Sequence, residues 1–148
     1  QRCSQLDGNL YFLDEADFDE KFINRSQLKI HMRSNRTEQR VYYSDTDHGG
    51  VVYYANYLKW FEVGRTEILR QNKLDYDEFE KQGLIAPVVE VKCIYKEPIK
   101  YNDLIIIETK VEHVGNSSIK FVYGIIRKND KKLLAEGYTV NVFVDMKT

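Results

Sequence analysis

The sequence predicts an α+β domain in which one long helix packs on one face of a curled antiparallel sheet. Apolar residues recur at three- and four-residue intervals over residues 53–72, which is typical of an amphipathic helix. From residue 85 onward apolar and polar residues alternate instead, as in strands with one face exposed to solvent. At least four such strands follow the helix, and the last three are expected to form an antiparallel meander.

The length and composition fit one globular domain. With 148 residues, 43% of them apolar, the chain can bury a core, and a second full domain is nearly excluded. Lys plus Arg (22) nearly balances Asp plus Glu (23), whereas a nucleic-acid binder usually carries a basic excess. No apolar run reaches the ~20 residues of a membrane helix and no signal peptide is evident, so we expect a soluble, cytoplasmic protein with no nucleic acid as partner and no membrane span.

Residues 1–36 differ from the rest and are expected to be an acidic N-terminal appendage and linker, with the main domain over residues 37–148. Six acidic residues and no basic one lie between Asp7 and Glu20, and the apolar residues among them fit one short amphipathic helix. So few apolar positions cannot form a core, which leaves a docked appendage, an addition made in cloning or a partner-binding tail. The polar run from Arg33 to Thr37 is interpreted as the linker.

The main domain is predicted to begin with a strand over Glu38–Tyr43 that runs into a turn-rich segment, Ser44–Gly50. The long helix follows over Tyr53–Asn72, and Gly64 within its apolar stripe indicates close approach to another backbone. A shorter helix is expected over Asp75–Lys81.

Hairpin turns are predicted between the later strands. Gly115-Asn116 and Asn129-Asp130 stand between alternating runs and suit tight turns with positive φ. Pro87 and Pro98 fall near the ends of the first strand after the helices, where a missing N–H is tolerated.

The segment before the long helix has the residues for chemistry on a carbonyl group. Two carboxylates, Asp45 and Asp47, and two glycines, Gly49 and Gly50, precede the helix directly. The first N–H groups of a helix are unpaired and partly positive, so they can polarise a carbonyl while a carboxylate attacks it or activates water. The alternative is that both aspartates are turn and cap residues, as in most Asp-Gly-rich loops.

Other chemistries fit less well. A calcium loop needs a bidentate Glu where Asn56 stands, and an aspartyl-phosphatase loop needs Thr or Val at Gly49 as well as alternating β-α units. His48 is interpreted as a solvated loop residue more readily than as a proton shuttle. His31, His113 and the two distant cysteines form no ligand pattern, so we expect no disulfide, metal or other cofactor.

The segment around these aspartates is Val41-Tyr42-Tyr43-x-Asp45-Thr46-Asp47-x-x-Gly50-Val51-Val52-Tyr53-Tyr54-Ala55-Asn56-Tyr57-Leu58, and it is followed by Phe61-Glu62 and Gly64-Arg65-x-Glu67. This run resembles the hotdog-fold acyl-CoA thioesterases of the 4-hydroxybenzoyl-CoA thioesterase group, most of all the Tol-Pal-cluster (YbgC-like) branch. The resemblance extends more loosely through Pro87-Val88-Val89, Tyr101-x-Asp103 and Gly115-x-x-Ser118, over roughly residues 37–145.

The resemblance implies a hotdog fold and a role for individual residues. Asp47 matches the catalytic carboxylate, which attacks the thioester or activates water, and Asp45 is supporting. The backbone N–H at Tyr54 polarises the thioester carbonyl. The implied substrate-binding residues are Gly50, Val51, Tyr54 and Ser118.

Two features depart from the family pattern. The Tol-Pal branch commonly has His where this chain has Tyr54, whereas the 4-hydroxybenzoyl-CoA type has Tyr. The basic cluster that binds the nucleotide phosphates in the latter type falls at residues 115–117, which are not basic here. The candidates to replace it are Lys92, Lys96, Lys100, Lys120, Arg127 and Lys128.

The expected function is therefore hydrolysis of an acyl-CoA to free acid and coenzyme A by a homodimer or homotetramer whose active sites are shared between protomers. One alternative is a noncatalytic module that binds acyl-CoA or acyl-carrier protein, against which Asp47 argues. Another is an interaction module that acts through its acidic N-terminal segment. The acyl group, whether short, long or aromatic, is left open by the sequence.

Overall fold

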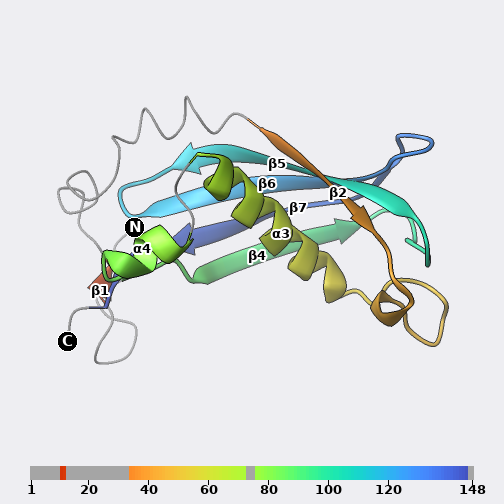
Figure 1. Ribbon diagram of the computed structural model, residues 1–148, viewed down its shortest axis with the longest axis horizontal. Helices are drawn as coiled ribbons and strands as arrows, with labels where there is room; N and C mark the ends of the chain where they lie inside the picture. The colour runs from red at the N-terminus through yellow and green to blue at the C-terminus, as the bar shows by residue number, and fades with distance from the viewer. Residues whose placement is uncertain (1–10, 13–33, 73–75, 147–148) are drawn as a thin grey trace.

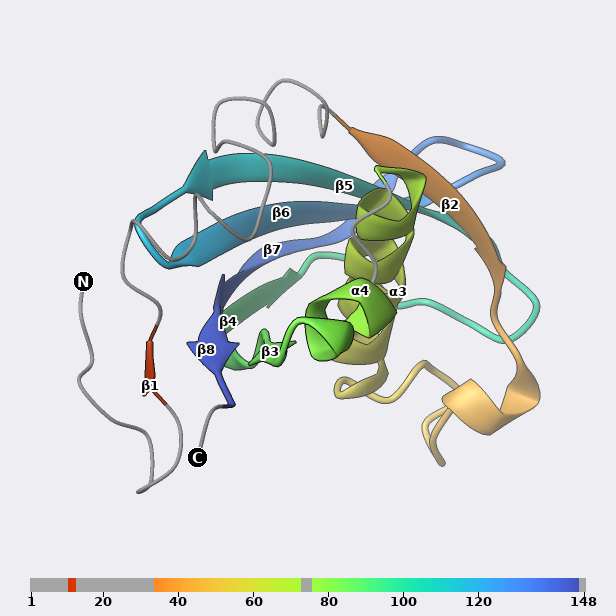
Figure 2. The same ribbon diagram turned by 60° about the vertical axis from the view of Figure 1, so that its left-hand side comes forward.

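The computed structural model describes residues 11–12, 34–72 and 76–146. Its main element is a five-stranded antiparallel sheet of order β2-β5-β6-β7-β4. The strands are β2 (Asn35–Arg40), β4 (Val88–Tyr95), β5 (Leu104–Val114), β6 (Ser118–Arg127) and β7 (Leu133–Val142). The sheet curls around helix α3 (Asn56–Gln71), which crosses one face (Figures 1 and 2). The predicted α+β class and the meander β5-β6-β7 are confirmed.

Shorter elements lie at the ends of the main sheet. The 3-10 helix η1 (Tyr43–Asp45) follows β2, and α4 (Tyr76–Lys81) follows α3. A small second sheet has the order β1-β8-β3, formed by β1 (Tyr11–Phe12), β8 (Val144–Asp145) and β3 (Leu84–Ile85). Among the described residues, no helix combines the length and the apolar character needed to cross a membrane.

The core lies between α3 and the sheet, where both sequence periods place apolar side chains. In β6 every second residue, from Ile119 to Ile125, faces α3 and is at most 4% exposed. The buried residues of α3 recur at three- and four-residue steps, as predicted: Tyr57, Trp60, Phe61, Gly64, Arg65, Ile68 and Leu69. Because this face of α3 is packed against the sheet, the helix holds the start of the preceding segment of the chain in a fixed position.

The N-terminal expectations differ from the structure at several points. The pairing of β2 with β5 begins at Asn35, inside the run interpreted as a linker, because an edge strand carries polar side chains of the kind found in linkers. The strand ends at Arg40, before the predicted Tyr43, and gives way to η1. Tyr11 and Phe12 form a strand and not part of the predicted helix, whose other residues lie outside the described segments.

Both predicted positive-φ turns are wrong. The positive-φ residues in the described segments are Gly50, Gly83, Asn102 and Lys131. The connections span residues 115–117 and 128–132, so they are longer than the two-residue hairpins that require positive φ at both positions. In the second connection only Lys131 takes this conformation, with φ 58°.

Helix α3 approaches the sheet very closely at Gly64. A Cβ atom on Gly64 would lie 2.1 Å from Oγ1 of Thr109 and 3.0 Å from Cγ2 of Ile107. The close approach predicted for Gly64 is therefore present, but it is to side chains of β5 and not to backbone. One turn earlier, Phe61 stacks on Tyr123 with ring centroids 4.3 Å apart.

The substitution Gly64→Ala tests this contact. Alanine normally stabilises a helix interior by about 1 kcal/mol over glycine, but overpacking a rigid core costs ~1–3 kcal/mol, and Thr109 is fully buried. We expect a net loss of about 1–2 kcal/mol in the free energy of unfolding, measured by urea denaturation. Adding Thr109→Ala should recover most of it, while the control Gly124→Ala, whose Cβ would lie 3.5 Å from Leu133, should be nearly neutral. A lone Gly64→Ala that is more stable than the parent would contradict the packing described.

Candidate active site

The loop that joins β2 to α3 is a folded unit, here called the Asp47 loop (residues 41–53). Thr46 and Val52 form an antiparallel bridge, and the N–H of Asp47 donates to the Val51 carbonyl at 2.9 Å. The turn between them closes with the Gly50 N–H donating to the Asp47 carbonyl at 3.0 Å, with Gly50 at φ 77°. The glycine is required there because L side chains rarely adopt this conformation.

Asp45 is a structural residue of this loop. It is 9% exposed, and its Oδ2 accepts a hydrogen bond from the Tyr42 N–H at 2.8 Å. Its carbonyl accepts from the Tyr53 N–H at 3.0 Å and from Nδ2 of Asn56 at 2.8 Å. The turn-and-cap alternative is therefore correct for Asp45, which connects the loop to the first residue of α3.

Asp47 is held differently. Its side chain is exposed, and Oδ1 accepts one hydrogen bond from the Gly49 N–H at 2.8 Å. Among the described residues, Oδ2 has no hydrogen-bond donor. One carboxylate oxygen is thus oriented by the turn, and the other is open to a bound molecule or to water.

The start of α3 lies next in the chain and offers unpaired donors. The structure begins the helix at Asn56, three residues later than predicted, because residues 53–55 form a turn in which the Tyr53 carbonyl accepts from the Asn56 N–H at 2.9 Å. Within the described segments the Tyr54 N–H has no acceptor. A donor of this kind at a helix start favours a negative or polarised oxygen.

Tyr95 at the end of β4 fixes this helix start. Its hydroxyl donates to the Tyr54 carbonyl at 2.9 Å, and its ring meets Tyr57 edge-on with centroids 4.7 Å apart. Burial and then a hydrogen bond with Cys93 raise the pKa of Tyr95 to about 12, so the hydroxyl stays protonated and donating at neutral pH. A hollow of about 230 Å³ lies beside these rings, lined by Tyr57, Tyr95, Lys96, Glu97 and Pro98.

The structure brings some of the predicted site residues together and leaves one apart. Asp47, Gly50 and Val51 share one turn, with Tyr54 just beyond it. Ser118 begins β6 at the opposite end of the sheet from Arg127, whose side chain reaches the Pro98 carbonyl near the Asp47 loop. Because a strand rises about 3.3 Å per residue, Ser118 lies roughly 30 Å along β6 from Arg127.

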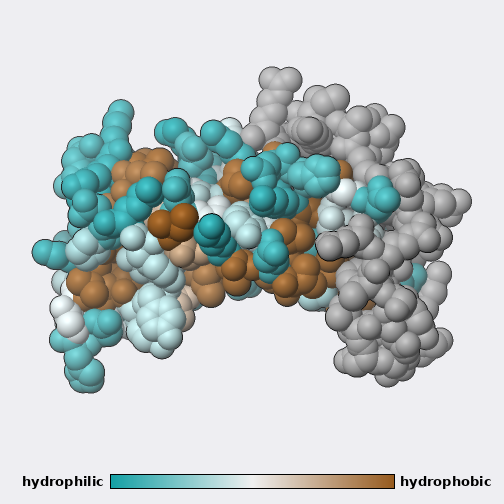
Figure 3. All heavy atoms as spheres, turned by 180° about the vertical axis from the view of Figure 1, so that it is seen from behind, coloured by the Kyte–Doolittle hydropathy of each residue, from teal (hydrophilic) through white to brown (hydrophobic). Residues whose placement is uncertain are grey.

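A second hollow lies on the face of the sheet turned away from α3, where apolar patches alternate with polar side chains (Figure 3). It measures about 480 Å³ and surrounds Gly124, with Val122, Ile126 and Leu133 among its lining residues. It is not lined by Asp47, Gly50, Val51, Tyr54 or Ser118, but it is lined by Lys92, one of the candidates for binding the nucleotide phosphates. Within one chain the larger hollow is therefore not where the Asp47 carboxylate lies.

Sequence reasoning missed Tyr95 and Ile99, and it considered Lys100 only as a candidate for binding phosphate, not as a contact of the Asp47 loop. The Val52 N–H donates to the Ile99 carbonyl at 2.8 Å, and Val51 forms a bridge with Lys100. These contacts join segments almost fifty positions apart, and no local spacing signals them. The Pro98 position was noted only as a strand end.

Known proteins resemble this chain in sequence and in fold. The model of the Thioesterase-like superfamily matches residues 41–148. The acyl-CoA thioesterase YbgC of Haemophilus influenzae is 42% identical over 60% of this chain, which spans 65% of that protein's length. The acyl-CoA thioester hydrolase YbgC of Escherichia coli O6:H1 is 33% identical over 72% of this chain and 78% of that protein. The crystal structure of a DHNA-CoA thioesterase from Staphylococcus aureus has a TM-score of 0.74 and 31% identity, covering 78% of this chain and 76% of that one.

The family match covers the Asp47 loop, α3 and the whole main sheet after β2. The fold, the family match and the sequence relatives therefore indicate the same family that the resemblance implied. The chain belongs to the thioesterase-like superfamily of hotdog-fold proteins.

Proposed function

We propose that this protein, through the domain expected over residues 37–148, hydrolyses an acyl-CoA thioester to a free acid and coenzyme A. The observation that carries the proposal is the exposed Asp47 carboxylate, with one oxygen held by Gly49 and the other open, directly before a helix start with an unpaired N–H. The named activities of the Haemophilus influenzae and Escherichia coli relatives support the same substrate class.

In the proposed reaction the thioester oxygen lies at the start of α3, where the Tyr54 N–H and the helix dipole stabilise the charge that develops on it. Asp47 either attacks the carbonyl carbon or takes a proton from an attacking water. If Asp47 attacks, a C–O bond to its carboxylate forms as the C–S bond breaks, and water then hydrolyses the resulting mixed anhydride to the free acid and restores the carboxylate. If Asp47 takes a proton from water, the water oxygen forms the C–O bond directly and the C–S bond breaks. In both routes the leaving sulfur takes up a proton that derives from water and departs as coenzyme A. The Tyr54 phenol has no required role in either route.

We further propose that the active unit is at least a dimer joined through the edge of β4. The two edges of the sheet differ: β2 has the polar sequence NRTEQR, whereas Val88, Val89 and Val91 of β4 are 42–51% exposed. A long apolar edge strand is a ready site for pairing with another strand. Two copies of this chain can pair their β4 strands through a two-fold axis.

Such pairing also supplies a role for Ser118. In β4, Val88 lies opposite Asn141, at the Ser118 end of the sheet, while Tyr95 lies at the other end beside Tyr54. A two-fold axis makes the paired β4 strands antiparallel, so the Ser118 end of one protomer meets the Tyr95 end of its partner. Each substrate site is then formed by residues of both protomers, and a single chain contains only part of it.

Replacing Asp47 with Asn tests the carboxylate. The amide keeps the size and the acceptor for the Gly49 N–H but removes the charge, so turnover should fall by on the order of a hundredfold or more with little change in melting temperature. Thiol release from a panel of acyl-CoA and aroyl-CoA thioesters is the measurement. Asp45→Asn should lower both the turnover and the melting temperature, because the Asp45 carboxylate accepts a hydrogen bond from the Tyr42 N–H that holds the loop. Near-normal turnover by the Asp47 variant would rule the assignment out.

A pair of variants separates backbone from side chain at the helix start. Tyr54→Phe leaves every N–H in place, so kcat should change by less than about tenfold. Gly50→Val should reduce it far more, because a branched residue is strained at φ 77° and would crowd the approaching carbonyl. If Tyr54→Phe reduced kcat more than Gly50→Val did, the donor to the thioester oxygen would be the Tyr54 phenol and not a backbone N–H.

Assembly is tested at the two sheet edges. Light scattering at micromolar concentration should give at least a dimer for the parent. Val91→Lys places a charge on the apolar edge and should yield a monomer with little activity, whereas Gln39→Lys puts the same charge on β2 and should leave the dimer intact. A stable, fully active monomer would refute the shared site.

A further inference from the structure

The turn Lys100–Asp103 contacts both ends of the Asp47 loop. At the start of the loop, the Val41 N–H donates to the Asp103 carbonyl at 2.9 Å, and the Val41 carbonyl accepts from the Asn102 N–H at 2.9 Å. At its end, Val51 bridges Lys100 and the Val52 N–H donates to the Ile99 carbonyl. Both Val41 and Ile99 are fully buried, so these contacts are shielded from water.

The Asp103 side chain closes this turn. Its Oδ2 accepts a hydrogen bond from the Lys100 N–H at 3.0 Å, while the Asp103 N–H donates to the Lys100 carbonyl at 3.2 Å. Asn102 between them has φ 70°, an uncommon conformation for a non-glycine residue, and Nη1 of Arg40 donates to its carbonyl at 2.8 Å. The backbone bends sharply here, and the bend is held by the Asp103 side chain and by that of Arg40 at the end of β2.

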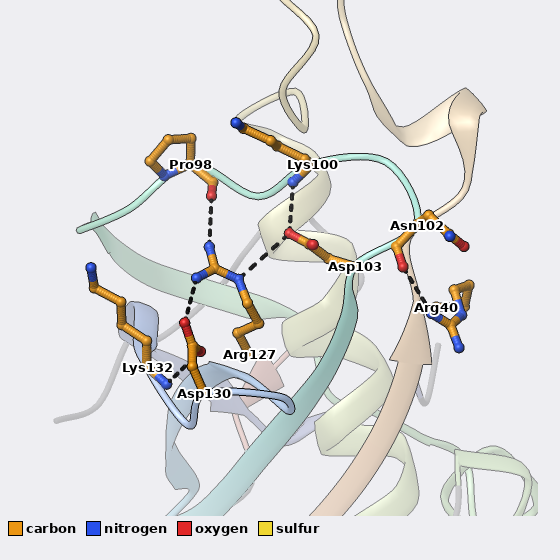
Figure 4. Close-up of polar contacts among 8 residues, drawn as sticks. All are labelled: Arg40, Pro98, Lys100, Asn102, Asp103, Arg127, Asp130 and Lys132. Carbon is orange, nitrogen blue, oxygen red and sulfur yellow. Dashed lines mark hydrogen bonds and ion pairs between the residues drawn. The ribbon is translucent and has the colours of Figure 1, made fainter.

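Arg127 connects this turn to the main sheet (Figure 4). Its Nε lies 3.8 Å from Oδ2 of Asp103, its Nη2 donates to the Pro98 carbonyl at 3.4 Å, and its Nη1 donates to Oδ2 of Asp130 at 2.9 Å. The Asp103 and Arg127 side chains are 24% and 22% exposed, so the pair is screened less than a surface ion pair. Asp130 is in turn fixed by the Lys132 N–H, which with Arg127 lowers the pKa of its carboxyl group.

We infer that Asp103, held by Arg127, is a positioning residue for Asp47: its carboxylate fixes the turn that clamps both ends of the Asp47 loop. The inference rests on the proposed function, because positioning matters only if Asp47 reacts. The connection runs from Arg127 to Asp103, from Asp103 to Lys100 and Val41, and from these to Val51 and the Asp47 N–H. Misplacement of a reacting group by about 1 Å can lower a rate by on the order of a hundredfold.

Kinetics of three variants test this role. Asp103→Ala should lower kcat by about ten- to a hundredfold and change KM by less than about threefold. Asp103→Asn keeps an oxygen that can accept from the Lys100 N–H, so it should restore most of the lost kcat. The control is Glu108→Ala, which removes a second arginine-paired carboxylate, on β5. The Glu108 side chain is 21% exposed and lies 2.7 Å from Arg36, and its removal should leave kcat unchanged. An equal loss of kcat in Asp103→Ala and Glu108→Ala would overturn the inference.

A double-mutant cycle separates positioning from general destabilisation. If Asp103 acts through Asp47, then adding Asp103→Ala to Asp47→Asn should reduce the residual kcat by less than about threefold. If the loss of kcat in the double variant equalled the product of the losses in the two single variants, the inference would be overturned. Should Asp103→Ala fail to fold, Arg127→Gln takes its place in the cycle, with the same expected direction.

Amide hydrogen exchange provides a measurement that does not need activity. Asp103→Ala should speed exchange at the Val52 and Asp47 amides by at least about tenfold while amides of β6 keep the parent rates. Unchanged exchange in the Asp47 loop would overturn the clamp. If no thioester is turned over by the parent protein, the proposed function fails, and the exchange result still decides whether Asp103 holds the loop.

Discussion

The close packing of α3 in the curled sheet is the constraint on which the other features depend. Gly64 lets the helix lie against Thr109 and Ile107, and Phe61 stacks on Tyr123 one turn earlier. These contacts leave the helix no freedom to shift along its axis, because a buried interface resists small displacements. The first turn of α3 is therefore held in place, and it determines the position of the Tyr54 N–H and of the loop that precedes it.

The Asp47 loop combines an exposed carboxylate with a backbone held from two sides. Asp45 connects the loop to α3 through Asn56, and Ile99 and Lys100 connect it to the segment between β4 and β5. A site that must stabilise developing charge gains when its dipoles are already oriented before the substrate arrives. In the proposed site this orientation comes from backbone hydrogen bonds, which side chains of many kinds could accompany.

That reliance on backbone explains what the sequence did and did not predict. The long helix and the meander follow from local period and are confirmed, with the helix beginning at Asn56 instead of Tyr53. The loop with Asp47 and Gly50 follows from local spacing, whereas Tyr54 was indicated only by the family resemblance. The contact of Tyr95 with the Tyr54 carbonyl and that of the Asp103 carbonyl with Val41 join positions over forty residues apart, which no local pattern reports. The hairpin φ angles were mispredicted because connection length, not composition, selects the turn type.

Strand β4 is an edge strand of the main sheet, and in the part of the chain that the structure describes it pairs with β7 alone. Its sequence VVEVKCIY has high β-propensity, and strands of this kind add to one another without limit when they stay unpaired. Glu90 and Lys92 interrupt the apolar residues, and Pro87 and Pro98 lie just outside the strand's two ends, so a third strand finds few further positions to extend the ladder. We therefore expect Pro87, Glu90, Lys92 and Pro98 to limit amyloid-like addition of strands at this edge of the sheet.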